Sequence, residues 1–328
     1  MNILLKKILK IVMSVVLGGF ILYWVYSDFD FEQAVSVLCN HTRWDWMLLS
    51  LFFGVMSHVL RGWRWKQTLE PLGVHPHSSD CVDAIFVSYA ANLVLPRVGE
   101  VSRCGVLMRY DEVPFSKSLG TVVTERLIDM LCVLLITGIT FLLQMPVFLD
   151  FFQQTGTKIP SLLHLVTSPW FYVALFSIIG VIVLVYYLLR MLSFFEKVKG
   201  VVLNVWEGIV SLRNVRRVPL FVFYTLFIWV CYFLHFYLTL FCFSFTEHLG
   251  LAAGLVMFVG GTFAVIVPTP NGAGPWHFAV ITMMMLYGVK AADAATFALI
   301  VHGIQTLLVI VLGLWGWLHL LLCRRSTR

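Results

Sequence analysis

Residues 92–103, Asn-Leu-Val-Leu-Pro-Arg-Val-Gly-Glu-Val-Ser-Arg, decide how this chain folds. They place a proline and three charged side chains, Arg97, Glu100 and Arg103, directly after an apolar run, in a sequence that is 60% hydrophobic and only 12% charged. Backbone that is not helical is tolerated at membrane depth only where it is buried in protein or lines a wet cavity, and a charge there marks a candidate functional site. We therefore interpret residues 81–110 as a re-entrant helical hairpin, in which two short helices enter the membrane and turn back.

A second break of the same kind lies far downstream, where residues 265–276 read Val-Ile-Val-Pro-Thr-Pro-Asn-Gly-Ala-Gly-Pro-Trp. Proline and glycine at this density cannot continue a helix, so backbone N–H and C=O groups are freed at depth and need partners. Two short hydrophobic segments that are interrupted by Pro and Gly in the two halves of a chain indicate the binding site of a transporter. We expect a second hairpin over residues 249–287, which enters from the opposite side and presents Asn271, Gly272 and Gly274 to a bound headgroup.

The composition determines the class of the protein. Several apolar runs reach the ~20 residues needed to cross a bilayer, and no long polar block is present, so we predict an all-α polytopic membrane protein with one domain over residues 1–328. The formal net charge is +6, but Lys and Arg cluster beside the ends of the apolar runs, which indicates contact with anionic lipid rather than nucleic acid. The seven cysteines are scattered without metal-type spacing, and we expect no metal and no other cofactor.

The apolar runs and their basic flanks predict about six full crossings and two opposed hairpins, which suggests an inverted repeat. By the positive-inside rule both termini are cytoplasmic, and the protein is a multi-pass protein of the cell membrane. Residues 31–40 should form a short helix on the outer surface, and residues 190–217 an amphipathic helix on the inner face. An outer loop is expected over residues 144–168. The expected full spans cover residues 8–26, 44–59, 116–143, 169–189, 218–245 and 294–322.

Basic and aromatic residues alternate over residues 61–66, Arg-Gly-Trp-Arg-Trp-Lys, at the predicted end of the second span. One interpretation is an interfacial anchor, in which Trp lies at headgroup level and Arg extends to the cytoplasmic surface. The other is that Arg61 or Arg64 guides an anionic headgroup, because the fork of a guanidinium matches the oxygens of a phosphate. The sequence leaves both interpretations open.

Residues 124–129, Thr-Glu-Arg-Leu-Ile-Asp, put further charges into the long helix predicted over residues 116–143. Glu125 and Asp129 lie at i and i+4 on one face, and Arg126 reaches Asp129 at i,i+3. One interpretation is a structural ion-pair network that closes the first hairpin onto this helix. The other assigns Glu125 to the substrate site. In either case we expect Arg126→Ala to leave Asp129 without its partner and to destabilise the protein.

These motifs, in this order, resemble the membrane region of the lysylphosphatidylglycerol synthases and their stand-alone, flippase-like relatives. The resemblance rests on residues 61–65, 92–103, 125–129 and 270–274 and covers nearly the whole chain. It implies translocation of an amphiphile with a polar or phosphate headgroup, without the soluble aminoacyltransferase domain that the synthases add. His277 and His302 stand where the family usually has an acid and an arginine, and Asn271 replaces a glycine, so different headgroup or proton chemistry is expected at these positions.

Three functions fit these observations: a lipid flippase, an integral-membrane enzyme that acts on a lipid-linked substrate, and a membrane partner of a separate lipid-modifying enzyme. The chain has no H-E-x-x-H, no G-x-S-x-G and no phosphate-binding loop of the G-x-x-x-x-G-K-[ST] type, so we expect a transporter that is neither an enzyme nor an ATPase. Two interpretations of His277 and His302 stay open: each satisfies a hydrogen bond in the protein interior, or the two face one another and titrate together. The candidate substrate-binding residues are Arg61, Arg64, Asn92, Arg97, Glu100, Arg103, Glu125, Asn271, Gly272, Gly274, His277 and His302, and the predicted structural ion pair is Arg126 with Asp129.

Overall fold

The computed structural model describes residues 3–27, 29–145 and 217–325, and this account is confined to them. Most of the predicted outer loop over residues 144–168, the predicted span over residues 169–189, and nearly all of the predicted inner-face helix over residues 190–217 lie outside the described residues.

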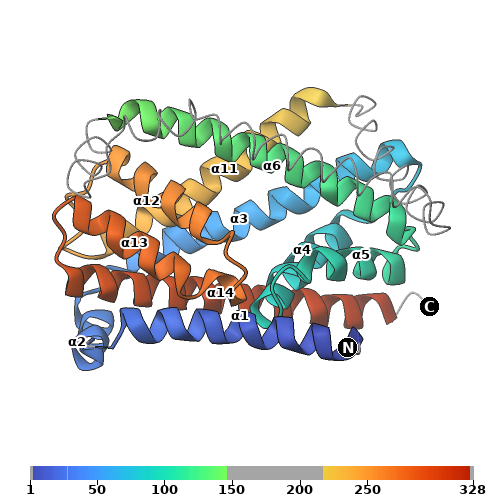
Figure 1. The fold of residues 1–328 in the computed structure, drawn as a ribbon. Helices are drawn as coiled ribbons and strands as arrows, with labels where there is room; N and C mark the ends of the chain where they lie inside the picture. Colours follow the sequence, from blue (N-terminus) through green and yellow to red (C-terminus); the bar gives the residue numbers. More distant parts are fainter. Residues whose placement is uncertain (1–2, 28, 146–216, 326–328) are drawn as a thin grey trace, which may run out of the picture.

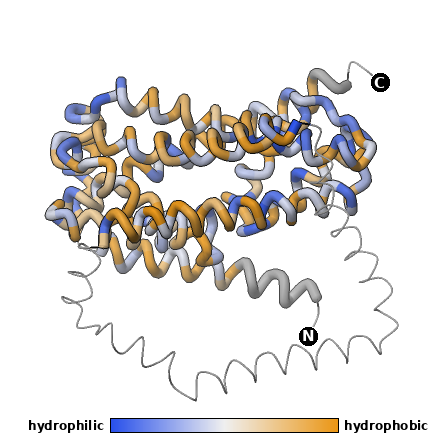
Figure 2. The backbone as a smooth tube through the Cα atoms, turned by 90° about the horizontal axis from the view of Figure 1, so that it is seen from above, coloured by the Kyte–Doolittle hydropathy of each residue, from blue (hydrophilic) through white to orange (hydrophobic). Residues whose placement is uncertain are grey.

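Long helices set the shape of the molecule and extend between its two ends (Figure 1). The tube in Figure 2 is hydrophobic along the middle of these helices and hydrophilic at both ends of the bundle, as a bilayer requires. Among the described helices, three are long and apolar enough to cross a membrane, namely Phe115–Leu143, Val218–Cys242 and Ala291–Leu322. The described residues contain no strand, so the prediction of an all-α membrane protein is confirmed. The long helices are α1 (Ile3–Val25), α3 (Trp44–Leu69), α6 (Phe115–Leu143), α11 (Val218–Tyr237) and α14 (Ala291–Arg325).

The outer surface of α6 illustrates why this bundle belongs in lipid. Leu131, Leu135 and Leu142 are 63%, 64% and 73% exposed. A soluble protein rarely exposes so many large apolar side chains on one element, whereas acyl chains solvate them at no cost. The short helix predicted over residues 31–40 is also present, as α2 (Phe31–Ser36) followed by a π-helical turn at Val37–His41.

The first hairpin consists of α4 (Ser78–Val94) and α5 (Gly99–Tyr110). Asn92 closes its turn, because its Oδ1 accepts a hydrogen bond of 2.8 Å from the backbone N–H of Gly99. A Cβ at Gly99 would lie 2.2 Å from the carbonyl oxygen of Ser88, so only glycine allows the two helices to approach this closely. The predicted break between residues 95 and 98 is therefore built by a side-chain hydrogen bond and a glycine contact.

The second hairpin consists of α12 (Leu251–Ala264) and α13 (Pro275–Leu286), joined through a 3-10 turn at Pro270–Gly272. Asn271 has a φ of 52°, a left-handed conformation that asparagine tolerates better than most residues. Gly274 has a φ of 92°, and a Cβ there would lie 2.8 Å from the carbonyl oxygen of Gly18 in α1. The tip of this hairpin is therefore packed tightly against the first helix.

The two hairpins enter the bundle from opposite ends. Figure 1 shows α4 and α5 at the end where both termini lie, and α12 and α13 at the other end. Their tips meet inside, where the guanidinium of Arg97 donates a hydrogen bond of 3.2 Å to the carbonyl oxygen of Ile266. The cytoplasmic location of the termini stays a prediction, but the structure places the described ends of α1 and α14 at one end of the bundle.

The structure corrects the prediction for the second span. That span was expected to end near residue 59, but α3 continues to Leu69 and ends in a 3-10 turn at Glu70–Leu72. Arg61 and Arg64 therefore lie inside the helix, where they are 3% and 0% exposed. The interfacial-anchor interpretation is wrong for both arginines, because carboxylates on α6 draw them into the protein.

Candidate functional site

A cluster of ionised side chains joins α3, α5 and α6 inside the bundle. The guanidinium of Arg103 donates a hydrogen bond of 2.6 Å to Glu125 and lies 2.8 Å from Glu100. On the far side of Glu125, Nε of Arg64 lies 3.4 Å from its carboxylate, and Arg64 also donates a hydrogen bond of 2.8 Å to Asp129. Arg103, Arg64 and Glu125 have side chains that are at most 1% exposed. Burial of such ions is tolerated only because each one is paired.

Asp129 is the carboxylate that connects this buried network to the rest of the site. It accepts hydrogen bonds from Arg61 and Arg64 of α3, and Nη2 of Arg126 lies 3.7 Å away. Arg126 also reaches Glu100, at 3.1 Å. Counted over these described residues, the cluster contains four arginines and three carboxylates, so it has one positive charge in excess.

Arg126 occupies a different environment from the other three arginines. Its side chain is 44% exposed, whereas those of Arg61, Arg64 and Arg103 are at most 3% exposed. The expectation that Arg126→Ala leaves Asp129 without a partner is wrong, because Asp129 keeps both Arg61 and Arg64.

A cavity of about 540 Å³ lies beside the cluster. Arg61, Arg126 and Asp129 reach its wall. Two tyrosines hold Arg61 in place there, since its guanidinium donates hydrogen bonds to the hydroxyls of Tyr89, at 3.0 Å, and Tyr232, at 2.9 Å. The charged part of the cavity is therefore preorganised by α3, α4, α6 and α11.

The rest of the cavity is mainly apolar. Along α6 the lining changes from the charged Arg126 and Asp129 to the apolar Met130, Val133 and Leu134. At a rise of 1.5 Å per residue, Arg126 and Leu134 lie ~12 Å apart along the helix axis. A cavity with a charged part and an apolar part fits a molecule that has a polar headgroup and a hydrocarbon chain. The other apolar residues of the lining are Trp229 and Phe236 from α11 and Phe258, Phe263, Val265, Ile266 and Trp276 from the second hairpin.

None of the four candidate residues of the first hairpin, Asn92, Arg97, Glu100 and Arg103, lines this cavity. Arg103 is enclosed by the cluster and by the ring of Trp65, whose centroid lies 4.6 Å from its guanidinium carbon. Asn92 closes the turn of the hairpin, as described above. Arg97 is exposed and lies outside the lining, but its partner Ile266 belongs to the lining. The structure therefore places Arg97 at the junction of the two hairpin tips.

The candidate residues of the second hairpin form a group with His302 of α14. The rings of His277 and His302 face one another, with centroids 4.5 Å apart, which is the arrangement that joint titration would require. Nε2 of His302 lies 3.2 Å from the carbonyl oxygen of Asn271, and the amide of Asn271 donates a hydrogen bond of 2.8 Å to Thr306. Trp276 connects this group to the cavity, because it lines the wall and its ring lies 5.1 Å from that of His302. Joint titration of the two histidines stays a prediction.

Several residues of the cavity were missed by the sequence analysis. Tyr89, Trp276 and Gln305 each stand alone in an apolar run of a different helix, Tyr232 and His235 lie three residues apart in α11, and no spacing connects these four helices. The only available signal is that a polar side chain inside a membrane span usually faces the protein interior.

One group of side chains among the described residues has the spacing of metal ligands, but it lies outside the cavity. His77, Asp80 and Asp111 place their ligand atoms within 4.8 Å of one another. Nδ1 of His77 lies 2.9 Å from Asp111, so this contact ties the start of α4 to the end of α5. We assign these residues a structural role in the first hairpin.

Comparison with known proteins agrees with this architecture. The model of the family described as the lysylphosphatidylglycerol synthase TM region matches residues 11–313, which include the cluster and both hairpins. A segment of 86 residues, 26% of this chain, is 31% identical to 14% of the glycosyltransferase AglD of Haloferax volcanii. A segment of 180 residues, 54% of this chain, is 23% identical to 49% of a UPF0104 membrane protein of Methanocaldococcus jannaschii. The chain thus matches about half, or less, of the length of these relatives.

Proposed function

Because the chain belongs to the lysylphosphatidylglycerol synthase transmembrane-region family, a family of lipid-related membrane proteins, we propose that it moves a lipid or lipid-linked amphiphile across the membrane. The proposed substrate has a headgroup that carries a phosphate or another anion. The observation that carries this proposal is the cavity, whose wall joins the ion cluster to apolar side chains of α6 and the second hairpin. On this proposal the protein is a transporter of the cell membrane, with both termini in the cytoplasm.

The charge of the cluster supports an anionic headgroup. An isolated charged residue costs ~2.5–3.5 kcal/mol at the centre of a membrane helix, so charges at depth are retained in pairs or in contact with polar ligands. Among the described residues, Arg61 and Arg126 reach the cavity together with one carboxylate, that of Asp129. Of these two arginines, Arg126 has the more exposed side chain, and its planar guanidinium can donate two hydrogen bonds to a phosphate.

The position of the cavity supports movement between leaflets. Tyr89 comes from the first hairpin, and Ile266 and Trp276 come from the second, so both hairpins contribute to one lining. Hairpins that enter from opposite ends and meet at a shared site can open that site to one side at a time. We expect relative movement of the two tips to provide this alternation.

The direct test is lipid translocation by the purified full-length protein in vesicles. The probe is a phosphatidylglycerol with a fluorescent acyl chain, and a membrane-impermeant reductant reports which fraction of it lies in the outer leaflet. We expect faster exchange than in protein-free vesicles and at least tenfold slower exchange for Arg126→Ala. The matched control is Arg109→Ala, an exposed arginine in the last turn of α5 that lies outside the cavity lining. Exchange no faster than in protein-free vesicles would overturn the proposal.

The likeness to part of a glycosyltransferase favours a second candidate, a membrane partner of a separate lipid-modifying enzyme. This candidate predicts no translocation by the purified protein and instead a stable complex with such an enzyme. Co-purification from membranes, followed by the same vesicle assay on the complex and on the chain alone, separates the two candidates.

A further inference from the structure

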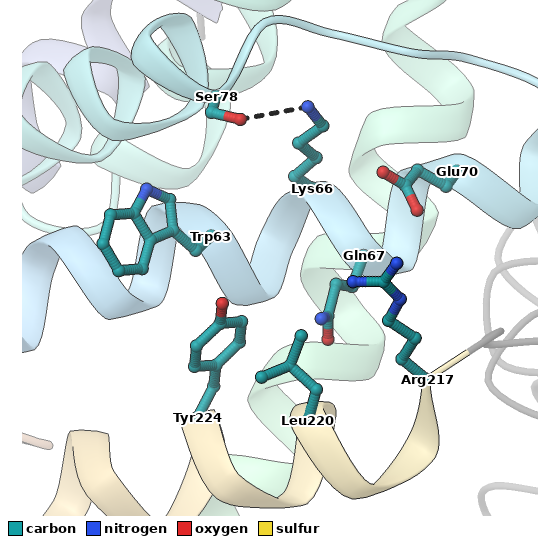
Figure 3. A pocket seen from close by; sticks show the side chains of 8 residues that line it. All are labelled: Trp63, Lys66, Gln67, Glu70, Ser78, Arg217, Leu220 and Tyr224. Carbon is teal, nitrogen blue, oxygen red and sulfur yellow. Dashed lines mark hydrogen bonds between the residues drawn. The ribbon is translucent and has the colours of Figure 1, made fainter.

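A second pocket, of about 500 Å³, lies where the last turns of α3 meet the first turns of α11 (Figure 3). This position is at the end of the bundle that holds both termini (Figure 1). The pocket shares no lining residue with the central cavity. Its lining consists of Trp63, Lys66, Gln67, Glu70, Ser78, Arg217, Leu220 and Tyr224.

Helix geometry separates this pocket from the ion cluster. Consecutive helical residues point about 100° apart, so Trp63 and Arg64 face different sides of α3. Arg64 turns to the cluster, where it lies 3.5 Å from the hydroxyl of Thr225. Trp63 and Tyr224 line the pocket, with ring centroids 6.1 Å apart. The pocket and the cluster therefore lie on different sides of α3, and both lie beside its contact with α11.

The pocket offers cations to an anion. The ammonium of Lys66 donates one hydrogen bond of 3.0 Å to Ser78, which leaves its other two hydrogens available (Figure 3). Arg217 is exposed and precedes the first turn of α11, so its charge adds to the positive end of that helix dipole. Within the described part of the chain, neither Lys66 nor Arg217 has a carboxylate within salt-bridge distance.

The pocket also offers acceptors to a hydrogen-bond donor. Oε1 of Gln67 is buried and accepts no hydrogen bond among the described residues, which is costly for an amide oxygen. Glu70 also lines the pocket and adds a carboxylate (Figure 3). A ligand that satisfies the whole lining therefore carries an anion for Lys66 and Arg217 and a hydroxyl or amino group for Gln67 and Glu70.

We propose that this pocket binds a phosphodiester headgroup that also carries a hydroxyl or amino group, separately from the cavity proposed for translocation. The phosphate lies between Lys66 and Arg217, and the donor group faces Gln67 and Glu70. Trp63 is 40% exposed, and tryptophan and tyrosine at the ends of membrane helices lie at the level of lipid headgroups. A membrane lipid and a soluble phosphodiester offer the same polar groups, and the test below distinguishes these sources.

The test uses a photoreactive amino acid in place of Leu220, which lines the pocket. The probe is radiolabelled dioctanoyl phosphatidylglycerol, added to the full-length protein in detergent. We expect cross-linking at this position, with at least a fivefold loss in the Lys66→Ala/Arg217→Ala variant. Arg109→Ala removes a cation at the same end of the bundle and should leave cross-linking unchanged. Melting temperatures show that each variant is folded. Where the double variant does not fold, Lys66→Gln replaces it, because this substitution removes the charge and keeps most of the side chain.

Competition identifies the ligand chemistry and its source. Dioctanoyl phosphatidylmethanol keeps the phosphodiester but lacks the hydroxyls of phosphatidylglycerol. It should therefore compete several-fold less well than unlabelled phosphatidylglycerol for cross-linking. Gln67→Leu should remove this difference between the two lipids. Weak competition by soluble glycerophosphoglycerol assigns the pocket to a membrane lipid, whereas equal competition assigns it to a soluble phosphodiester. Cross-linking that is unchanged in the double variant, or equal competition by phosphatidylmethanol in the wild type, overturns the proposal. Neither result depends on translocation, which is tested separately by the vesicle assay with Arg126→Ala.

Discussion

At the scale of the residue, Arg61 and Arg126 share one carboxylate but have different surroundings. Arg61 is 3% exposed and holds Asp129 and the hydroxyls of Tyr89 and Tyr232. Arg126 is 44% exposed and reaches the cavity from its edge. A buried arginine with this many partners supports the fold, whereas a half-exposed one is available to a ligand.

We therefore expect Arg61→Ala to destabilise the protein by ~1–3 kcal/mol, because the buried hydroxyls of Tyr89 and Tyr232 lose their donor while Asp129 keeps Arg64. Arg126→Ala should cost ~1 kcal/mol or less, because exposed ion pairs contribute little, yet it should slow translocation strongly. Thermal unfolding in detergent, measured alongside vesicle exchange, separates the two effects. Equal melting temperatures for the two variants would contradict this division of roles.

The facing rings of His277 and His302 suggest a proton-dependent step. Two imidazolium ions 4.5 Å apart in a site of low dielectric repel one another, so we expect at most one to be charged while the hairpin stays closed. Imidazole is the side chain that changes charge nearest to neutral pH. Translocation should then respond to an imposed pH gradient, and His277→Gln or His302→Gln should remove that response while lipid binding persists. An unchanged pH profile in both variants assigns the pair a structural role.

At the scale of the element, the contact between α4 and α14 depends on glycines of α14, and it is tightest at Gly313. A Cβ at Gly313 would lie 2.2 Å from that of Ala90, so α14 passes α4 at a distance that no larger residue permits. At Gly303, on the same helix, a Cβ would meet no atom within 4 Å. The same substitution thus has opposite expected effects at two positions of α14.

Gly313→Ala should destabilise the protein by ~1–3 kcal/mol, because an extra methyl group in a close-packed contact forces the helices apart. Gly303→Ala should be neutral or stabilise it by up to ~1 kcal/mol, since alanine favours the helix over glycine. Thermal unfolding of both variants provides the comparison. A Gly313→Ala variant as stable as Gly303→Ala would show that α4 and α14 are not in contact at this level.

At the scale of the whole molecule, the hairpins give the bundle two distinct ends. The described ends of α1 and α14 lie with α4 and α5, and the connections of α12 and α13 lie opposite (Figure 1). His77 precedes α4 at the first end, and Glu247 precedes α12 at the second. Their side chains are 64% and 50% exposed, so each offers a labelling position at its own end.

In a cysteine-free background, we expect His77→Cys to react with an impermeant maleimide only from the cytoplasmic side of sealed membranes, and Glu247→Cys only from the other side. Cysteines placed at either terminus should react from the same side as His77→Cys, in agreement with the positive-inside rule. Reaction of the two cysteines from one side would contradict the arrangement of the hairpins.

The sequence by itself determined the elements. The helix predicted over residues 116–143 matches α6 almost to the residue, and the hairpin predicted over residues 81–110 matches α4 and α5 to within three residues, because apolar length and breaks at proline and glycine are local properties. The positions of both hairpins followed from the same local signals. The predicted end of the second span near residue 59 was wrong. Charged residues in α3 resemble the end of a span in the sequence, because their partner carboxylates on α6 are far away along the chain.

Only the tertiary structure decided which charges meet. Glu125 and Asp129 stand beside Arg126 in the sequence, yet Arg64 contacts both carboxylates from α3. The cavity and its two tyrosines depend on helices whose contacts span 28 to 171 positions of the chain. Such pairings have no local signature, because the desolvation of an ion is offset by whichever opposite charge the packing of distant helices brings within reach.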